Sequence, residues 1–487
     1  MIDVKAKIHD KFSIEFKVGY VVKRKLKENK FALNTWIFVP NSLDINPMTY
    51  SKTEFYRDIK TNIRLITPIF LLREIADGNA IPLNNLEKSF HALASDPSST
   101  NIKEYEYQIK MFSAIFKSAV RDEVIRIMNN PLRGETEYLC TAYVNNIRSI
   151  RTKFRELKRI INVPTVEPEV MNYYLFGDEF ISNTIEQHNF RLLSFLENKR
   201  NPKYDDEINE VKDLTRQETE YKISQGYLVA EKDNPVRNRE LLYRYGMLKK
   251  YIESDLFLNA RKKKDGVLVE QIYYSIAAGL SMIFATTIAF SVQQKYGNFT
   301  MPLFVALVVS YMLKDRIKEL MRYYFAYRLK DKYFDNKTTI SMKGEAIGWC
   351  KEGVDFITDE KTPQEVLEIR SRSALLETEN RNRDEKVLLY RKSVLLDRET
   401  MEQNSEYSVA GVNDISRFYI NRLVEKTDNP EVPIRVLDEN DSVSVILGEK
   451  AYYLNIIMQL QFEEQTDYKR FRAVFNRMGI SQLEELK

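Results

Sequence analysis

The side chains best suited to chemistry in this chain are few and far apart. There are two cysteines, Cys140 and Cys350, and three histidines, His9, His91 and His188. A structural zinc ion needs about four cysteine, histidine or carboxylate ligands at close range. None of these five residues has a neighbour at the short spacing of a recognised zinc motif. We therefore assign no metal ligand.

Glycine-rich and nucleophile motifs are also missing. Only 15 of 487 residues are glycine, and the chain contains no phosphate-binding loop, dinucleotide fingerprint, metalloprotease helix motif or nucleophile elbow. We assign no catalytic residue and no cofactor, and the sequence favours a role other than catalysis. An enzyme whose acidic residues meet only on folding stays open as an alternative.

One helical segment carries a concentration of basic side chains. A solvated helix face explains it, and an acidic partner is the alternative. The 74 basic and 70 acidic residues give a formal charge of +4, which is too close to balance to indicate nucleic-acid binding. The candidates for an acidic partner are Arg148, Arg151, Arg155, Lys158 and Arg159.

Two uncharged stretches, Gln271–Gln294 and Tyr296–Leu313, are separated only by Lys295 in a chain that is 30% charged. Each is close to the length of helix that crosses a bilayer, and Pro302 suits the first turn of the second helix. The pattern predicts a transmembrane hairpin of two antiparallel helices. A buried helical hairpin in a soluble core is the alternative.

Basic residues flank the hairpin on both sides, and the connection between the two stretches contains one. By the positive-inside rule, both termini face the cytoplasm and the short loop near Asn298 faces outward. In a bacterium this would be the inner membrane. We expect the flanking cations to contact anionic lipid headgroups. These candidates are Arg261, Lys262, Lys263, Lys264, Lys314, Arg316 and Lys318.

Small residues recur along both apolar stretches at helical spacing. Such residues let membrane helices approach closely, either within one hairpin or between copies, so we expect a homo-oligomer held by the transmembrane and long helices. The packing candidates are Ser275, Ala277, Gly279, Ser281, Ala285, Ala289, Ala306 and Ser310.

The remaining sequence predicts an α+β protein with four regions. Residues 1–45 contain alternating strand patterns, and residues 46–262 repeat apolar residues at the helical spacing of a bundle or coiled-coil stalk. The hairpin and its helical extension occupy residues 263–335. Residues 336–487 are predicted to be β-rich and mainly antiparallel. The N-terminal strands need partners from elsewhere. We expect them to complete the C-terminal sheet.

The leading functional hypothesis is a two-pass membrane-anchored protein whose cytoplasmic domains bind, scaffold or signal. Membrane lipids and an unidentified protein are its expected partners. An oligomeric membrane effector or channel built from the hairpin is one alternative, and a membrane-tethered enzyme is the other. The apolar stretches contain no ionisable group that would line a channel, which favours anchoring.

Overall fold

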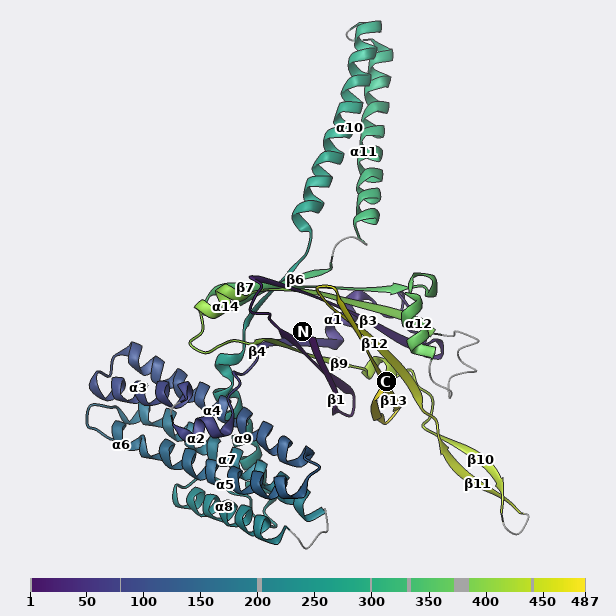
Figure 1. The fold of residues 1–487 in the computed structure, drawn as a ribbon. Coiled ribbons are helices and arrows are strands. Elements are labelled where there is room, and N and C mark those ends of the chain that lie inside the picture. The colour runs from purple at the N-terminus through teal and green to yellow at the C-terminus, as the bar shows by residue number, and fades with distance from the viewer. Residues whose placement is uncertain are drawn as a thin grey trace. The chain divides into compact units, whose positions relative to one another are not determined.

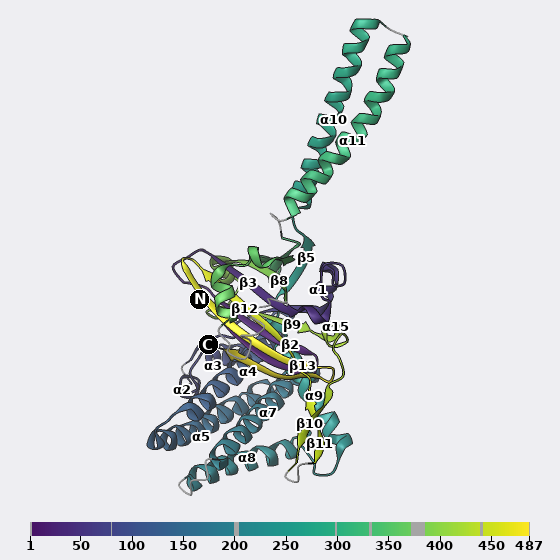
Figure 2. The same cartoon turned by 90° about the vertical axis from the view of Figure 1, so that its right-hand side faces the viewer.

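The computed structural model is a mixed α+β fold of long helices and antiparallel sheets (Figures 1 and 2). Its atoms form two compact units: a sheet unit made of residues 1–64, 258–406 and 411–487, and a helical unit made of residues 65–257 and 407–410. The structure describes residues 2–78, 80–198, 204–297, 300–330, 334–371, 385–438 and 442–486.

The larger sheet runs in the order β14-β13-β12-β3-β8-β7-β6-β5. The N-terminal strand β3 lies inside it, where Trp36 pairs with Leu389 of β8 and Ile457 of β12. The expectation that N-terminal strands complete the C-terminal sheet is confirmed. The strands are β3 (Glu28–Pro40), β5 (Asn259–Lys264), β6 (Asn336–Met342), β7 (Glu345–Ile357), β8 (Glu385–Asp397), β12 (Tyr452–Phe462), β13 (Gln465–Asn476) and β14 (Gly479–Leu486).

A smaller sheet packs against the larger one. Its order is β1-β2-β9-β4, with strands β1 (Ile2–Asp10), β2 (Ser13–Val21), β4 (Ile59–Leu65) and β9 (Gly411–Tyr419). Phe16 of β2 meets Phe471 of β13 edge-on, with ring centroids 5.9 Å apart. Strand β4 and the first four residues of β5 fall within 46–262, which the sequence assigned to helices, and residues 46–64 and 258–262 belong to the sheet unit.

A two-stranded ribbon, β10 (Glu431–Leu437) and β11 (Val443–Glu449), extends from the sheet unit (Figure 1). In the sequence, the strand-like segments Ser442–Leu447 and Ala451–Leu460 flank the turn-like Gly448-Glu449-Lys450, a pattern that predicts a hairpin. That prediction is wrong, because β11 pairs with β10 and β12 pairs with β3 and β13. Strand β10 was missed because Pro433 lies inside it, and proline argues against a strand except at an edge.

The helical unit consists of α2 (Leu72–Asp77), α3 (Ile81–Ser95), α4 (Ser99–Asn129), α5 (Arg133–Glu156), α6 (Lys158–Ile161), α7 (Pro168–Asn198), α8 (Asp205–Ser224) and α9 (Pro235–Ile252). Phe112 of α4, Phe154 of α5 and Tyr174 of α7 stack in series, with ring centroids 5.6 and 5.2 Å apart. Gly177 allows α7 to approach α4, since a Cβ there would lie 2.7 Å from Ile109.

Apolar residues at helical spacing, from Leu241 to Leu256, predict a helix over 238–260 that runs towards the apolar stretch. The helix formed there, α9, ends at Ile252 instead. The chain forms a short 3-10 turn at Ser254–Leu256 and then enters β5. Two long helices follow, α10 (Val267–Tyr296) and α11 (Met301–Lys330), which lie side by side and antiparallel (Figures 1 and 2). Smaller helices in the sheet unit are α1 (Lys52–Asp58), α12 (Gln364–Ser371), α14 (Arg398–Gln403) and α15 (Asn421–Val424).

Candidate functional site

Helix α10 exposes large apolar side chains along its whole length. Ile272, Ile276, Leu280, Ile283 and Phe290 are all about half exposed or more. Only 11% of the most apolar part of α10 is buried, whereas a core helix of a soluble protein would be covered on its apolar faces. Among the described residues, α10 is the one helix that is long and apolar enough to cross a membrane.

The small-residue stripe forms the seam between α10 and α11. Ala277, Ser281 and Ala285 of α10 and Ser310 of α11 are buried, and the Ser310 hydroxyl donates a hydrogen bond to the Ala285 carbonyl oxygen at 2.9 Å. Ala289 and Ala306 are half-buried. The remaining two candidates, Ser275 and Gly279, are exposed. The seam residues therefore pack within one hairpin.

Helix α11 begins at Met301, where the sequence places it, and Asn298 of the connecting loop lies outside the described residues. Its uncharged part, Met301–Leu313, is about 20 Å long at 1.5 Å per residue. The hydrocarbon core of a bilayer is about 30 Å thick. The second apolar stretch is therefore too short as a helix to meet the length of a membrane span by itself.

The basic residues expected at the membrane surface occupy two kinds of element. Arg261, Lys262, Lys263 and Lys264 form an exposed run on β5, the edge strand of the larger sheet, so their side chains alternate between its two faces. Lys262 pairs with Glu352 and lies 4.5 Å from the centre of the Tyr56 ring. On α11, Lys314, Arg316 and Lys318 lie directly beyond the uncharged part.

In the helical unit, two of the five predicted partner-binding cations are held internally. Arg151 and Arg155 of α5 both pair with Glu218 of α8, at 2.7 and 2.8 Å. Arg155 also contacts Asp178 at 3.3 Å. Glu218 is fully buried. These two arginines therefore join helices α5, α7 and α8.

The other three cations differ in exposure. Arg148 is half-buried, and the Lys158 ammonium lies 5.9 Å from the centre of the Tyr174 ring. Arg159 is exposed. Part of the cluster therefore stabilises the helical unit. The remaining candidates for binding an acidic partner are Arg148, Lys158 and Arg159.

Asp178 is the centre of the buried polar network. It accepts hydrogen bonds from the hydroxyls of Tyr221 and Tyr227, at 2.8 and 2.9 Å. Burial raises the pKa of Asp178 above its usual value, although Arg155 and the two hydroxyls oppose that rise. The Arg155 guanidinium lies 3.4 Å from the centre of the Tyr221 ring. A carboxylate enclosed in this way joins helices and is closed to a substrate.

His188 of α7 makes the helical unit sensitive to acid. Burial, and then the positive charges of Arg191, Lys117 and Arg121, lower the pKa of His188 to about 4. The unfolded chain takes up this proton near pH 6.5, so stability falls as the pH is lowered from about 6.5 to about 4. The expected loss is at most about 3 kcal/mol.

The His188→Gln variant tests this expectation. Chemical unfolding followed by circular dichroism at pH 7 and pH 4.5 should show a smaller pH dependence than in the unmodified protein. His91→Gln, at an exposed position, is the matched control. Equal pH dependence in all three proteins would contradict the assignment.

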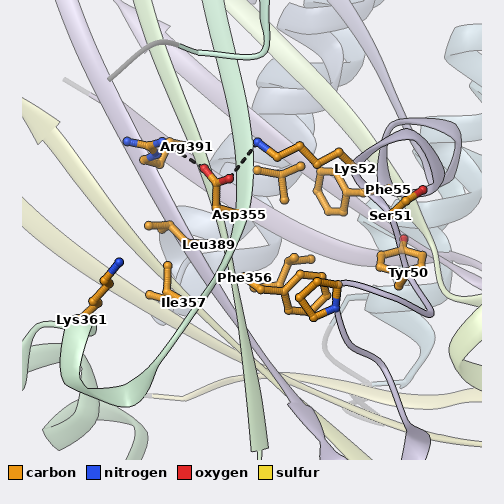
Figure 3. A pocket seen from close by; sticks show the side chains of 13 residues that line it. Tyr50, Ser51, Lys52, Phe55, Asp355, Phe356, Ile357, Lys361, Leu389 and Arg391 are labelled. Atoms are coloured by element: carbon orange, nitrogen blue, oxygen red, sulfur yellow. Dashed lines mark hydrogen bonds and ion pairs between the residues drawn. The ribbon is translucent and has the colours of Figure 1, made fainter. Parts of the chain in front are cut away.

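A cleft of about 650 Å³ lies in the sheet unit between the loop preceding α1 and strands β7 and β8 (Figure 3). Its wall is apolar where Phe356, Ile357 and Leu389 line it and charged where Asp355 and Arg391 line it. Helix α1 is fixed at this edge by a capping box, in which the hydroxyl of Ser51 accepts from the Glu54 amide and the Glu54 carboxylate accepts from the Ser51 amide.

The charged end of the cleft is internally neutralised. The Lys52 ammonium contacts Asp355 at 2.7 Å, and Arg391 donates to Asp355 at 3.2 Å (Figure 3). Lys52 also contacts Asp335 at 2.7 Å. Burial acts to lower the pKa of Lys52, but its hydrogen bonds to the two carboxylates outweigh burial and raise it. Lys52 therefore keeps its proton at neutral pH, which suits ligand binding better than proton transfer.

No protein-family model, curated protein or solved structure matches this chain. Within the described residues, no group of three or more histidine, cysteine or acidic side chains is arranged to hold a metal ion.

The β10–β11 ribbon is an apolar surface of the sheet unit. Large apolar side chains are exposed on both strands, at positions that face both sides of the ribbon. They are Val432, Ile434, Leu437, Val443, Val445, Ile446 and Leu447. Exposed apolar patches of this kind mark sites of protein association, and an open strand pair offers unpaired backbone groups at its edges.

Sequence reasoning missed both the cleft and the ribbon. The cleft residues Lys52, Asp355 and Arg391 come from three distant segments, and no local spacing connects them. The ribbon carried a usable signal in the alternation of Val443 and Val445, but the wrong partner strand was assigned to it.

Proposed function

We propose that this protein is anchored in a membrane by the α10–α11 hairpin, and that its sheet and helical units act on the cytoplasmic side as a binding, scaffolding or signalling module. The observation that carries the proposal is the continuous exposed apolar face of α10. Transfer of such a face from water into lipid is strongly favourable. Both helices cross the bilayer in this proposal.

The orientation follows from charge. The run Arg261–Lys264 directly precedes α10, and Lys314, Arg316 and Lys318 follow the uncharged part of α11. Basic flanks on both sides keep the termini in the cytoplasm. The loop at Asn298 would then face outward, and anionic lipid headgroups would meet the basic residues.

Two surfaces of the sheet unit support the binding role. The cleft presents an apolar wall beside ion-paired side chains, which is the usual character of a ligand-binding site. The β10–β11 ribbon exposes apolar side chains suited to a protein partner. The enzyme alternative is less well supported, because Asp355 is the one carboxylate among the described residues that line the cleft.

Charges on the lipid face of α10 should abolish anchoring. Each aspartate near the centre of a membrane helix costs about 3 kcal/mol on insertion. We expect the membrane-bound fraction of the double variant Leu280→Asp, Ile283→Asp to fall at least about tenfold after a carbonate wash. The matched control is Met48→Asp, because the Met48 side chain lies in a loop of the sheet unit and is 95% exposed.

Both tryptophans, Trp36 and Trp349, lie in the sheet unit. Their fluorescence will therefore report whether that unit still folds in the double variant. If the double variant stays with the membranes as well as the control does, anchoring by α10 is excluded.

A further inference from the structure

The two hairpin helices are aligned in a fixed register. Ser310 donates to the carbonyl oxygen of Ala285, and the Arg322 guanidinium lies 4.7 Å from the centre of the Tyr274 ring. Residues 314–322 of α11 therefore lie level with residues 274–281 of α10. The charged part of α11 is placed beside the first half of the apolar stretch of α10.

The two helices differ sharply in character at this level. Leu268, Ile272, Ile276 and Leu280 of α10 form an exposed apolar stripe on the side away from the seam. The facing stretch of α11 contains six ionisable side chains. They are Lys314, Asp315, Arg316, Lys318, Glu319 and Arg322.

These charges divide between two sides of α11. Asp315 and Glu319 are one turn apart and exposed, so they share an outward helix face. Lys314, Lys318 and Arg322 follow the buried seam residue Ser310 at steps of four and are half-buried, and Arg322 lies against Tyr274 of α10. Towards the loop, the charged face of Asp315 and Glu319 continues through Phe304, Val308 and Tyr311, at steps of four and three, and all three are exposed.

A single hairpin surrounded by lipid cannot hold the apolar stripe of α10 in lipid and the charged residues of α11 in water at the same time. If α10 is immersed to its full apolar length, the six charges of α11 lie within the cytoplasmic half of the bilayer. A charged side chain at the centre of a membrane helix costs about 3 kcal/mol, and such residues face water or one another. Withdrawing the charges into water would expose the apolar stripe of α10 instead.

We propose that copies of the hairpin assemble with the charged face of α11 turned inward and the apolar stripe of α10 turned towards lipid. The charged residues then line a water-filled vestibule in the cytoplasmic half of the membrane. Glu319 already pairs with Arg322 of its own helix at 3.0 Å, so Asp315 of one copy can pair with Lys318 of the next. Phe304, Val308 and Tyr311 close the vestibule towards the loop.

This assembly rests on the proposed membrane insertion and adds its partner, a second copy of the same chain. It also changes the earlier interpretation of the hairpin. The absence of ionisable groups from the uncharged stretches favours simple anchoring, but the register brings charged residues of α11 to the depth of α10. In this assembly, α11 of one copy packs against α11 of a second copy.

Single cysteines distinguish the possible arrangements in the full-length protein. Asp315→Cys and Glu319→Cys report on the charged face, and Ile276→Cys and Leu280→Cys report on the apolar stripe at the same level. The native thiols give little background, since Cys140 and Cys350 are buried and burial raises the pKa of each to about 12. The probes are a water-soluble methanethiosulfonate added from the cytoplasmic side and copper phenanthroline.

We expect the two α11 cysteines to react at least about tenfold faster than the two α10 cysteines. The α11 cysteines should also form disulfide-linked dimers that the α10 cysteines do not form. Rapid reaction at all four positions would place this half of the hairpin outside the bilayer and overturn the vestibule. Absence of both reaction and cross-linking on α11 would overturn it as well.

A carbonate wash of the same membranes separates failure of the vestibule from failure of the anchor. If the cysteine variants stay in the membranes but lack the expected labelling, the assembly is refuted and anchoring stands. If they are released by the wash, the proposed membrane insertion fails first.

Discussion

Replacing Lys392 with methionine should destabilise the sheet unit by about 3–5 kcal/mol. The Lys392 ammonium contacts Asp414 at 2.6 Å and donates to the Ser416 hydroxyl at 2.9 Å, and the side chains of the ion pair are each 2% exposed. Burial acts to lower the pKa of Lys392, but the charge of Asp414 outweighs burial and raises it. Methionine would leave a buried carboxylate without its counter-charge.

Tryptophan fluorescence during chemical unfolding measures the effect, since Trp36 and Trp349 both belong to this unit.

Two further variants give this test its controls. Lys27→Met removes an exposed lysine that pairs with Glu399 and should change stability far less, because water screens an exposed ion pair. The double variant Lys392→Met, Asp414→Leu removes both buried charges and should recover much of the lost stability. A loss in Lys392→Met no larger than in Lys27→Met would contradict the account.

The second large effect is expected at Glu218 in the helical unit. Glu218→Leu should cost about 3–5 kcal/mol, because the guanidinium groups of Arg151 and Arg155 both lose their ion pair with this carboxylate. Both arginine side chains are less than one-fifth exposed, so water replaces the lost contact poorly. The helical signal at 222 nm follows the unfolding of this unit.

Asp213→Leu on the same helix is the matched control for Glu218→Leu. Asp213 forms an exposed pair with Arg216 three residues away, and such pairs contribute at most about 1 kcal/mol. Similar losses in the two variants would show that the buried network is not a main source of stability in the helical unit.

The fold class was predictable because periodicity is a local property. Phe12–Val18 and Ala32–Val39 alternate as strands do, and they correspond to parts of β2 and β3. The long apolar repeats around Phe112 and Phe154 correspond to α4 and α5. Strand pairing was harder to predict. Pro433 argued against a strand at β10, so β11 was paired with the wrong partner.

The candidate sites depended on contacts that sequence spacing does not encode. Arg151 and Arg155 looked like a solvated or partner-binding face, but Glu218, 63 residues beyond Arg155, meets both of them. The hairpin was visible from composition alone. The depth of the charged residues of α11 relative to α10 could not be predicted, because it depends on the contact between Ser310 and Ala285.

The topology of the hairpin tests the central claim most directly. Single cysteines at Lys295 near the loop, at Met48 of the sheet unit and at Tyr243 of the helical unit would be labelled in intact cells with a membrane-impermeant maleimide; all three positions are exposed. Anchoring with both units in the cytoplasm predicts labelling of Lys295→Cys from outside, and labelling of the other two only after permeabilisation. Labelling of all three from the same side would show that the hairpin does not cross the membrane.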